Sequence, residues 1–291
     1  MAVRIIPKLE IKGENLVKGI RFDGLRVLGS PHRIAKHYYD HGADELIYVD
    51  IVASLYDRNN LLDIVTKTAS DIFIPLTVGG GIRTLDDIQN ALLAGADKVA
   101  INTAAIKEPS FIRKAANRFG SSTIVVQIET QKRAEGKYEA FTDNGRESTG
   151  FDALEWAKQV IDLGAGEILL TSVDRDGTGM GIDLSLVQII SDASNVPVVV
   201  GGGVGKIQDA VEAIQTNRID GLTIASCFHY EQLNENEIDH SCKTQIENKY
   251  RGSQYDRKSF GNISPFPIPA LKQELNKKNI PCIMHCEEKF S

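Results

Sequence analysis

Eight short runs of β-branched and aliphatic residues recur along the chain, and amphipathic helical patterns separate most of them. Runs of this length fit single strands, whereas the stretches between them, about 10–15 residues long, repeat apolar residues at helical spacing. Alternation of strands and helices predicts parallel strands joined by helical crossovers. Eight such units predict an α/β fold that closes into a (β/α)8 TIM barrel rather than an open sheet. The expected strands span residues 4–11, 45–52, 75–78, 98–101, 124–128, 167–171, 197–200 and 221–224.

The two halves of the chain resemble each other in a constant register. Residues 42–46 (GADEL) match residues 164–168 (GAGEI), and residues 74–81 (IPLTVGGG) match residues 196–203 (VPVVVGGG). Both pairs are offset by 122 residues (164 − 42 and 196 − 74). A repeat of this length is too long for a solenoid, and it predicts a barrel built from two four-strand halves with a twofold internal repeat.

The length of 291 residues fits one such barrel, which commonly takes about 250 residues. We therefore expect a single domain over residues 1–291. One region breaks the alternation, because residues 231–267 are polar and lie between the last expected strand and a final expected helix at 269–279. We expect a long insertion in the loop after the eighth strand, either a lid over the active site or a surface excursion without a role.

The charge balance limits the classes of partner. A formal net charge of −6 and a pI of about 5.6 argue against nucleic acid, because phosphate backbones call for a basic face. No apolar run approaches the roughly 18 residues that span a bilayer, and the N-terminus does not resemble a signal peptide. We therefore expect a cytoplasmic protein without membrane contact.

The four cysteines are Cys227, Cys242, Cys282 and Cys286. They gather in the last quarter of the chain and form no disulfide framework, so free thiols are the simplest interpretation in a reducing compartment. Cys282, His285 and Cys286 lack the spacing of a common zinc site and a fourth ligand. We expect no metal and no cofactor.

Two glycine triplets, at residues 79–81 and 201–203, each follow an expected strand directly. Glycine there lets the backbone approach a ligand and turn its N–H groups outward, and a following helix start favours an anion. In barrels of this kind a phosphate commonly lies between the loops after the seventh and eighth strands. Because the glycine triplets recur at repeat-related positions, we favour two phosphate cradles over an interpretation as tight turns alone. The first cradle comprises Gly80, Gly81, Asn102 and Thr103, and the second comprises Gly202, Gly203, Ala225 and Ser226.

Carboxylates stand at the C-terminal ends of the expected strands, where barrel enzymes carry their function. Glu10 and Glu129 lie on repeat-related strands, so we expect them to face each other across the mouth of the barrel. A facing pair between two phosphate cradles suits general acid–base catalysis on a substrate with two phosphates. Asp50 stands near the end of the second expected strand, and Asp174 and Asp176 follow the sixth, although a solvated loop acid is the stronger interpretation of Asp174.

Nine short motifs point to a known family: RIIP (4–7), VKG (17–19), GADEL (42–46), TVGGGIR (77–83), GADKV (95–99), INTAA (101–105), GAGEILLTS (164–172), DRDGT (174–178) and ASCFH (225–229). With them the chain resembles the cyclase subunit of imidazole glycerol phosphate synthase, over residues 4 to about 230 and again at the last helix. The motifs together are specific for that family, but they are not specific for one substrate.

The resemblance implies an ammonia-dependent cyclase and lyase of histidine biosynthesis. In that family a glutaminase subunit docks on the N-terminal face of the barrel in a heterodimer, and ammonia passes along the barrel axis. The ammonia attacks the bis-phosphorylated phosphoribulosyl-formimino-aminoimidazole carboxamide ribonucleotide. Cyclisation and cleavage then give imidazole glycerol phosphate and an aminoimidazole carboxamide ribonucleotide.

The resemblance also assigns roles to residues. Glu10 and Glu129 stand where the family has catalytic aspartates, and we expect Asp176 to join them. Without the resemblance, Lys18 would count as a surface lysine; with it, this point charge would close over a phosphate. The further expected substrate contacts are Asp50 and Thr171. In the family, a ring of four charged residues gates the entry of ammonia. Its counterparts in this chain stand at the strand starts: Arg4, Glu45, Lys98 and Glu167. Without the resemblance, these four charges would count as a stabilising salt-bridge layer.

The lumen departs from the family pattern. Both catalytic acids are one methylene longer, Lys8 replaces a small residue, and Gln127 replaces a small apolar one. Ser122 also replaces a glutamine that is common in the family. Alternation along a strand places Lys8 on the inward face with Glu10, and an unpaired buried charge is costly. We therefore expect Lys8 to pair with one of the two acids and retune both.

Three functions remain open at this stage. The first is the histidine-pathway cyclase. The second is a paralogue that delivers ammonia for amidation of a surface-polysaccharide sugar, since coordinated lumen changes fit a new substrate. The third is a non-catalytic barrel that serves as the partner of a glutaminase, against which the retained acids weigh.

Overall fold

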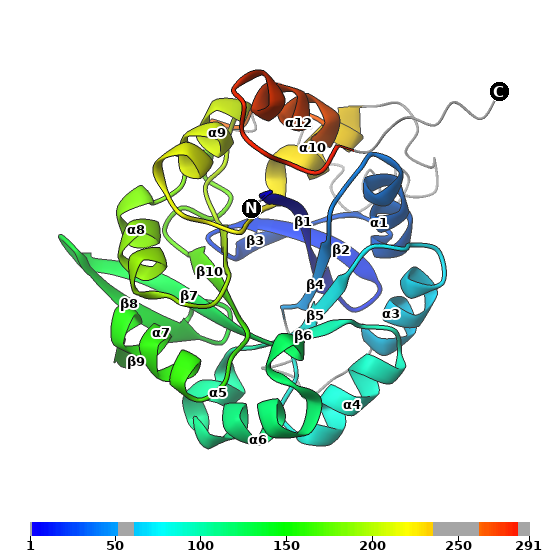
Figure 1. Ribbon diagram of the computed structural model, residues 1–291. Helices are drawn as coiled ribbons and strands as arrows, with labels where there is room; N and C mark the ends of the chain where they lie inside the picture. Colours follow the sequence, from blue (N-terminus) through cyan, green and yellow to red (C-terminus); the bar gives the residue numbers. More distant parts are fainter. Residues whose placement is uncertain (1, 52–60, 235–261, 285–291) are drawn as a thin grey trace.

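The computed structural model describes residues 2–51, 61–234 and 262–284. Its barrel strands are β1 (Arg4–Lys12), β4 (Leu46–Asp50), β5 (Leu76–Gly79), β6 (Lys98–Ile101), β7 (Ile124–Ala134), β10 (Glu167–Ser172), β11 (Val198–Gly201) and β12 (Gly221–Ile224). These strands run parallel in the order β10-β11-β12-β1-β4-β5-β6-β7, and β7 pairs with β10 to close the ring (Figure 1). The predicted (β/α)8 TIM barrel is therefore confirmed.

Helices surround the barrel on its outer side (Figure 1). Several begin at a side chain that satisfies the backbone N–H groups left free at a helix start. Thr84 and Asp87 form a reciprocal capping box, and Asp152 and Asp183 accept N–H groups at the starts of the helices that follow them. The helices are α1 (Pro31–Asp40), α3 (Leu61–Ala69), α4 (Leu85–Leu93), α5 (Thr103–Lys107), α6 (Ser110–Phe119), α7 (Ala153–Asp162), α8 (Leu184–Ala193), α9 (Ile207–Thr216), α10 (Ser226–Asn234) and α12 (Ile268–Lys277).

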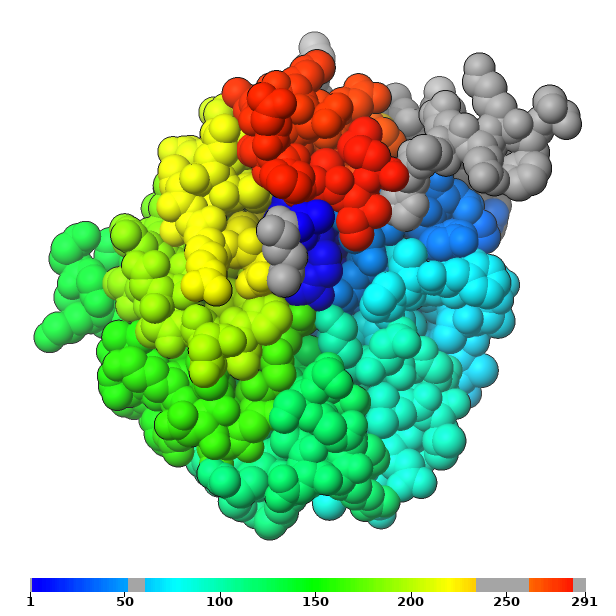
Figure 2. Space-filling model, in the orientation of Figure 1, coloured from blue at the N-terminus to red at the C-terminus, as the bar shows by residue number. Residues whose placement is uncertain are grey.

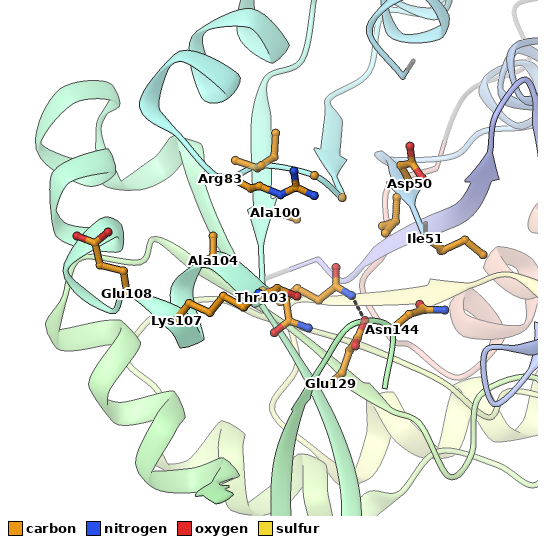
Figure 3. Close-up of a pocket in the computed structure, with 16 residues that line it drawn as sticks. Asp50, Ile51, Arg83, Ala100, Thr103, Ala104, Lys107, Glu108, Glu129 and Asn144 are labelled. Carbon is orange, nitrogen blue, oxygen red and sulfur yellow. Dashed lines mark hydrogen bonds between the residues drawn. The ribbon is translucent and has the colours of Figure 1, made fainter. Parts of the chain in front are cut away.

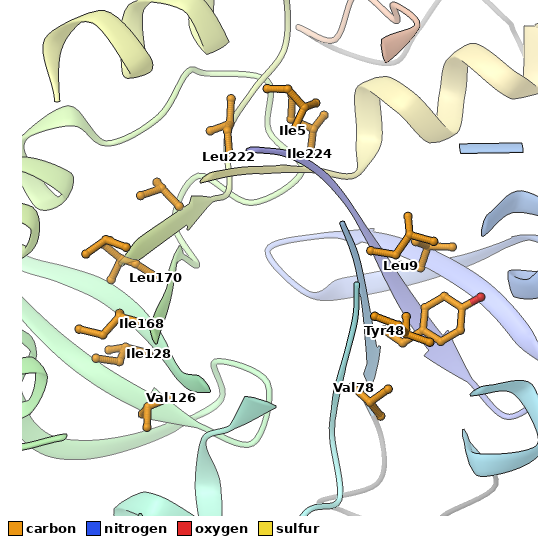
Figure 4. Packing of buried hydrophobic residues seen from close by; sticks show 14 of the residues in the cluster. Ile5, Leu9, Tyr48, Val78, Val126, Ile128, Ile168, Leu170, Leu222 and Ile224 are labelled. Carbon is orange, nitrogen blue, oxygen red and sulfur yellow. The ribbon is translucent and has the colours of Figure 1, made fainter. Parts of the chain in front are cut away.

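Side chains of each barrel strand alternate between two apolar layers. The outward layer, which packs against the helices, includes Ile5 and Leu9 (Figure 4). The inward layer fills the lumen with a separate cluster that includes Ile6, Ile47 and Leu169. Burying one such side chain contributes about 1.5–3 kcal/mol. Because the middle of the lumen is packed, polar chemistry is confined to its two ends.

Two antiparallel arms extend the barrel strands, and the sequence pattern does not predict them. β2 (Asn15–Ile20) and β3 (Asp23–Gly29) follow β1, whereas β8 (Lys137–Thr142) and β9 (Glu147–Asp152) follow β7. β7 itself runs on to Ala134 instead of ending at residue 128. The arms are partly exposed and mix polar with apolar residues, so they lack the continuous apolar runs of the buried barrel strands.

One backbone contact recurs at the spacing of the sequence repeat. A Cβ on Gly80 (φ +87°) would lie 2.1 Å from the carbonyl oxygen of Asp50, and a Cβ on Gly202 (φ +91°) would lie 2.7 Å from that of Ser172. The glycines and their partners are both offset by 122 residues (202 − 80 and 172 − 50). This equivalence supports the half-barrel repeat, which remains a prediction.

The last described residues lie at the N-terminal ends of the barrel strands. The N–H of Val3 donates to the carbonyl oxygen of Pro281 at 3.0 Å, and Lys272 of α12 forms a buried salt bridge of 2.6 Å with Asp44. Figure 2 views this face, on which the red C-terminal residues reach the blue N-terminal residues. The C-terminal segment therefore forms part of the N-terminal face of the barrel.

The predicted insertion at 231–267 is described only at its two ends. Residues 231–234 form the end of α10, because the helix that starts at Ser226 continues to Asn234. Residues 262–267 lead into α12, and there the N–H of Ser264 donates to the carbonyl oxygen of Gly205 at 2.6 Å. Residues 235–261, like Cys242, His285 and Cys286, lie outside the described residues.

None of the helices in residues 2–51, 61–234 and 262–284 is long and apolar enough to cross a membrane. In the same part of the chain, no three His, Cys, Asp or Glu side chains are grouped so that they could hold a metal ion.

Candidate active site

A cavity of about 250 Å³ opens at the C-terminal ends of β4, β5, β6 and β7 (Figure 3). Asp50 and Glu129, which the sequence placed at strand ends, both line it. The cavity is also lined by all four residues of the predicted first cradle: Gly80, Gly81, Asn102 and Thr103. The structure therefore brings the first cradle and one predicted catalytic acid into a single site.

The second predicted cradle lies on the neighbouring strands β11 and β12. Gly202 and Gly203 follow β11, and Ala225 and Ser226 follow β12. The loop after β10 covers this cradle, since the N–H of Gly181 donates to the carbonyl oxygen of Gly203 at 2.8 Å. Of the two cradles, the first lines the cavity described above and the second does not. Phosphate binding at each remains a prediction.

Glu10 lies in a buried network of charges. The Nζ atom of Lys18 donates to both Glu10 oxygens at 3.0 Å and to Oδ1 of Asp176 at 2.6 Å. Burial raises the pKa of Glu10, and the charge of Lys18 opposes that effect. Burial acts to lower the pKa of Lys18, but the carboxylates of Asp176 and Glu10 outweigh it and raise that pKa. Lys18 thus bridges two predicted catalytic acids. The sequence analysis expected it to contact a phosphate and did not predict this bridge.

Glu129 is buried at the end of the barrel part of β7. One carboxylate oxygen accepts a hydrogen bond from Nε2 of Gln127 at 2.7 Å, and the other accepts the N–H of Gly145 at 2.8 Å. Burial raises the pKa of Glu129 to about 7, and the nearby charge of Glu10 adds to the rise. A carboxyl group with such a pKa can both give and take a proton near neutral pH.

Lys8 lies in the lumen beside both acids. Its Nζ atom is 3.8 Å from a carboxylate oxygen of Glu10 and 5.0 Å from the centre of the Phe22 ring, which the β2–β3 arm supplies. Its positive charge lowers the pKa of Glu10 and of Glu129. The expected pairing of Lys8 with a lumen carboxylate is therefore present.

Thr171 on β10 stands opposite Glu129 in the strand register. Its side chain is fully buried, and its hydroxyl group has no hydrogen-bond partner among the described residues. A buried hydroxyl without a partner is costly, and this cost is recovered when a ligand supplies the partner. The geometry is compatible with the substrate contact expected of Thr171, which remains a prediction.

A buried histidine holds the backbone beneath the two acids. Nε2 of His229, on α10, lies 3.1 Å from the carbonyl oxygen of Lys8, and the hydroxyl of Tyr38 lies 2.6 Å from its Nδ1. β12 pairs with β1 as far as Pro7, and β2 pairs with β1 from Glu10 onward. His229 therefore hydrogen-bonds to the β1 backbone between these two pairings. Burial lowers the pKa of His229 to about 3, which keeps the ring neutral. Sequence analysis found no role for this residue.

The four predicted gate residues form a closed ring at the opposite end of the barrel. Arg4 contacts Glu45 at 2.6 Å and Glu167 at 2.7 Å. Lys98 contacts Glu45 at 2.8 Å and Glu167 at 3.1 Å. The hydroxyl of Thr77 donates a further hydrogen bond of 2.7 Å to Glu45. Each charge therefore has two opposite neighbours, and the ring caps the lumen at the strand starts.

Asn144 is a residue of the site that sequence analysis missed. It lies in the turn between β8 and β9, and it lines the cavity together with Gln127 and Glu129 (Figure 3). Asn144 and Gly145 form an Asn-Gly pair, which is the strongest short-range signal for a hairpin. That pair could have revealed both the arm and the residue.

Known proteins resemble this chain over most of its length. The profile of the family described as "Histidine biosynthesis protein" matches residues 4–234. An imidazole glycerol phosphate synthase subunit HisF from Legionella pneumophila is 55% identical over 207 residues, which cover 71% of this chain and 98% of the relative. A protein of the same name from Alkaliphilus metalliredigens (strain QYMF) is 47% identical over 230 residues, 79% of this chain and 91% of the relative. The chain therefore belongs to the histidine biosynthesis protein family.

Proposed function

We propose that this chain is the cyclase subunit of imidazole glycerol phosphate synthase and converts the bis-phosphorylated ribonucleotide named above with ammonia. The observation that carries the proposal is Glu129, a carboxyl group with a pKa of about 7 that shares one cavity with the first glycine cradle. A phosphate in that cradle would place the neighbouring part of the substrate beside Glu129. Relatives that carry the name of this enzyme favour it over sugar amidation and over a non-catalytic barrel.

The proposed chemistry needs proton transfers that the two acids can provide. Ammonia must lose a proton as it forms its new bond to carbon, and the departing amine must gain one. Glu129 suits both transfers because its pKa lies near neutrality. Lys18 holds Glu10 and Asp176 together on the other side of the lumen, so the three groups act as one charged unit. The second cradle would take the other phosphate.

A glutaminase subunit would dock on the N-terminal face. Two large apolar side chains are exposed there, because Phe73 (82% exposed) precedes β5 and Leu93 (77% exposed) ends α4. Ile283 and Met284 of the C-terminal segment are also about half exposed. Exposed apolar residues that gather on one face mark interaction sites. The ring of charged residues, which consists of Arg4, Glu45, Lys98 and Glu167, lies on the same face. There it would gate the entry of ammonia into the lumen.

The test of the reaction is a turnover assay with the bis-phosphorylated ribonucleotide and an ammonium salt. We expect formation of imidazole glycerol phosphate without any partner protein, since free ammonia can enter the barrel by itself. Absence of product at saturating ammonium, from protein that is folded by circular dichroism, would refute the proposal. An inactive Glu129→Gln variant serves as the control for background reaction.

A further inference from the structure

Asn144 is buried in the wall of the cavity, and its amide is unsatisfied. The residue is 9% exposed, and its Nδ2 atom has no hydrogen-bond partner among the described residues. A buried amide N–H group without an acceptor is costly, and such groups in native proteins call for an explanation. Asn144 lines the cavity, and a turn of its shielded Nδ2 atom toward that space would bring it to an acceptor on a ligand.

The backbone at Asn144 is also unusual. Asp143 (φ +50°) and Asn144 (φ +60°) both adopt the left-handed conformation, which glycine accepts at less cost. The next residue, Gly145, is a glycine in the same conformation. A turn that needed only its backbone shape would be served at least as well by glycine at position 144. An Asn-Gly pair suits a hairpin turn, so the turn accounts for the residue type but not for the unpaired amide.

The turn itself joins the first cradle to Glu129. The N–H of Asp143 donates to the hydroxyl of Thr103 at 3.3 Å, and Asn102 donates to the carbonyl oxygen of Phe141 at 3.2 Å. On its other side, the N–H of Gly145 donates to Glu129 at 2.8 Å. Asn144 stands between these two attachments, and Figure 3 shows it beside Glu129 at the same cavity as Thr103. The amide of Asn144 thus lies between the first cradle, where the phosphate is expected, and Glu129, where proton transfer is expected.

We propose that the side-chain amide of Asn144 binds a hydroxyl group of the substrate, in the carbon chain that joins a phosphate to the reacting atoms. A hydroxyl group fits because it can accept from the amide N–H and donate to the amide oxygen. The proposal rests on the proposed function for the phosphate in the first cradle. In the phosphoribulosyl part of the proposed substrate, the carbons between phosphate and reacting atoms carry hydroxyl groups. Asn144 would therefore distinguish a sugar phosphate from a bare phosphate.

The test compares two probes on wild-type protein and an Asn144→Gly variant. Dissociation constants for ribulose 5-phosphate and for inorganic phosphate are measured by titration calorimetry. We expect the variant to bind ribulose 5-phosphate about five- to tenfold more weakly, the effect of one lost hydrogen bond, and to bind inorganic phosphate as before. The melting temperature of the variant should stay within a few degrees, because glycine tolerates the left-handed backbone.

The matched control is Asn279→Gly. Asn279 has the same backbone conformation (φ +57°) and is exposed after α12, so its replacement should alter neither dissociation constant. Equal affinity of wild type and Asn144→Gly for ribulose 5-phosphate would overturn the proposal and leave Asn144 as a turn residue. Failure of the wild type to bind ribulose 5-phosphate would overturn it as well. Binding that depends on Asn144 without turnover of the ribonucleotide would instead reject the proposed reaction alone.

Discussion

The ammonium group of Lys18 lies 3.0 Å from both carboxylate oxygens of Glu10, and it contacts Asp176 at 2.6 Å as well. One buried cation thus pairs with two buried acids at the mouth of the barrel. The arm formed by β2 and β3 carries this lysine back over the strand that bears Glu10.

Replacement of Lys18 by Met should strongly destabilise the fold. The change would leave buried Asp176 without this cation and Glu10 with only the more distant Lys8, at a cost of about 3–5 kcal/mol in the free energy of unfolding. Urea unfolding measures this cost. The control is Lys114→Met, which removes an exposed pair with Glu108 and should cost less than about 1 kcal/mol. Similar small losses in both variants would contradict the buried network.

Glu129 should govern the pH dependence of activity near neutrality. We expect an inflection near pH 7 in the profile of kcat/KM for wild type, and a loss of about 100-fold or more in Glu129→Gln. The folded-state pKa is raised above the usual 4.5, so the protonated form is the one that folding favours. The free energy of unfolding should therefore fall, by about 3 kcal/mol at most, as pH rises from about 4.5 through 7. Glu129→Gln should lack this fall, and an unchanged pH profile in that variant would argue against the assignment.

Lys8 should lower the pH at which Glu129 titrates. Its charge lowers the pKa of Glu129, so Lys8→Met should move the inflection of the kcat/KM profile to higher pH. The control is Lys12→Met, which removes an exposed lysine at the end of the same strand. A shift of equal size in both variants would mean that general charge, and not the position of Lys8, sets the pKa.

Arg4→Met should open the ring at the N-terminal face. It removes two of the four contacts between cations and acids, and we expect the ratio of ammonium-supported to glutamine-supported turnover to rise several-fold in the complex with the glutaminase. The exposed Arg118 provides the control variant Arg118→Met. An unchanged ratio would assign the ring to stability alone.

His229 should make the fold sensitive to acid. Its folded-state pKa of about 3 lies below the usual 6.5, so the unfolded chain binds the extra proton first. The free energy of unfolding should fall as pH drops from about 6.5 to 3, by about 5 kcal/mol at most. His229→Gln should remove this part of the dependence in urea unfolding. Between pH 4.5 and 6.5 the trend opposes that of Glu129, so each variant has to be compared with wild type at every pH.

The barrel could be predicted from sequence because its strands are buried on both faces. Such strands read as continuous apolar runs, and the glycines after β5 and β11 mark where those runs end. The ring could also be predicted, because the family resemblance gives its four residues and Arg4 and Lys98 stand at strand starts near the axis. The contacts of Lys18 could not, because they depend on an arm whose strands are partly exposed. Asn144 was missed for the same reason, as its arm mixes exposed with buried residues.

The two arms also bear on how an enzyme of this kind can diverge. Each springs from the strand that carries one of the two acids, and each places its own side chains at the mouth: Lys18 and Phe22 from one, Asn144 from the other. Neither arm takes part in closing the ring of barrel strands. Apart from Lys18, whose charge pairs with buried acids of the barrel, substitutions in an arm can therefore reshape what the mouth accepts while the scaffold beneath stays intact. The two arms can be redesigned one at a time.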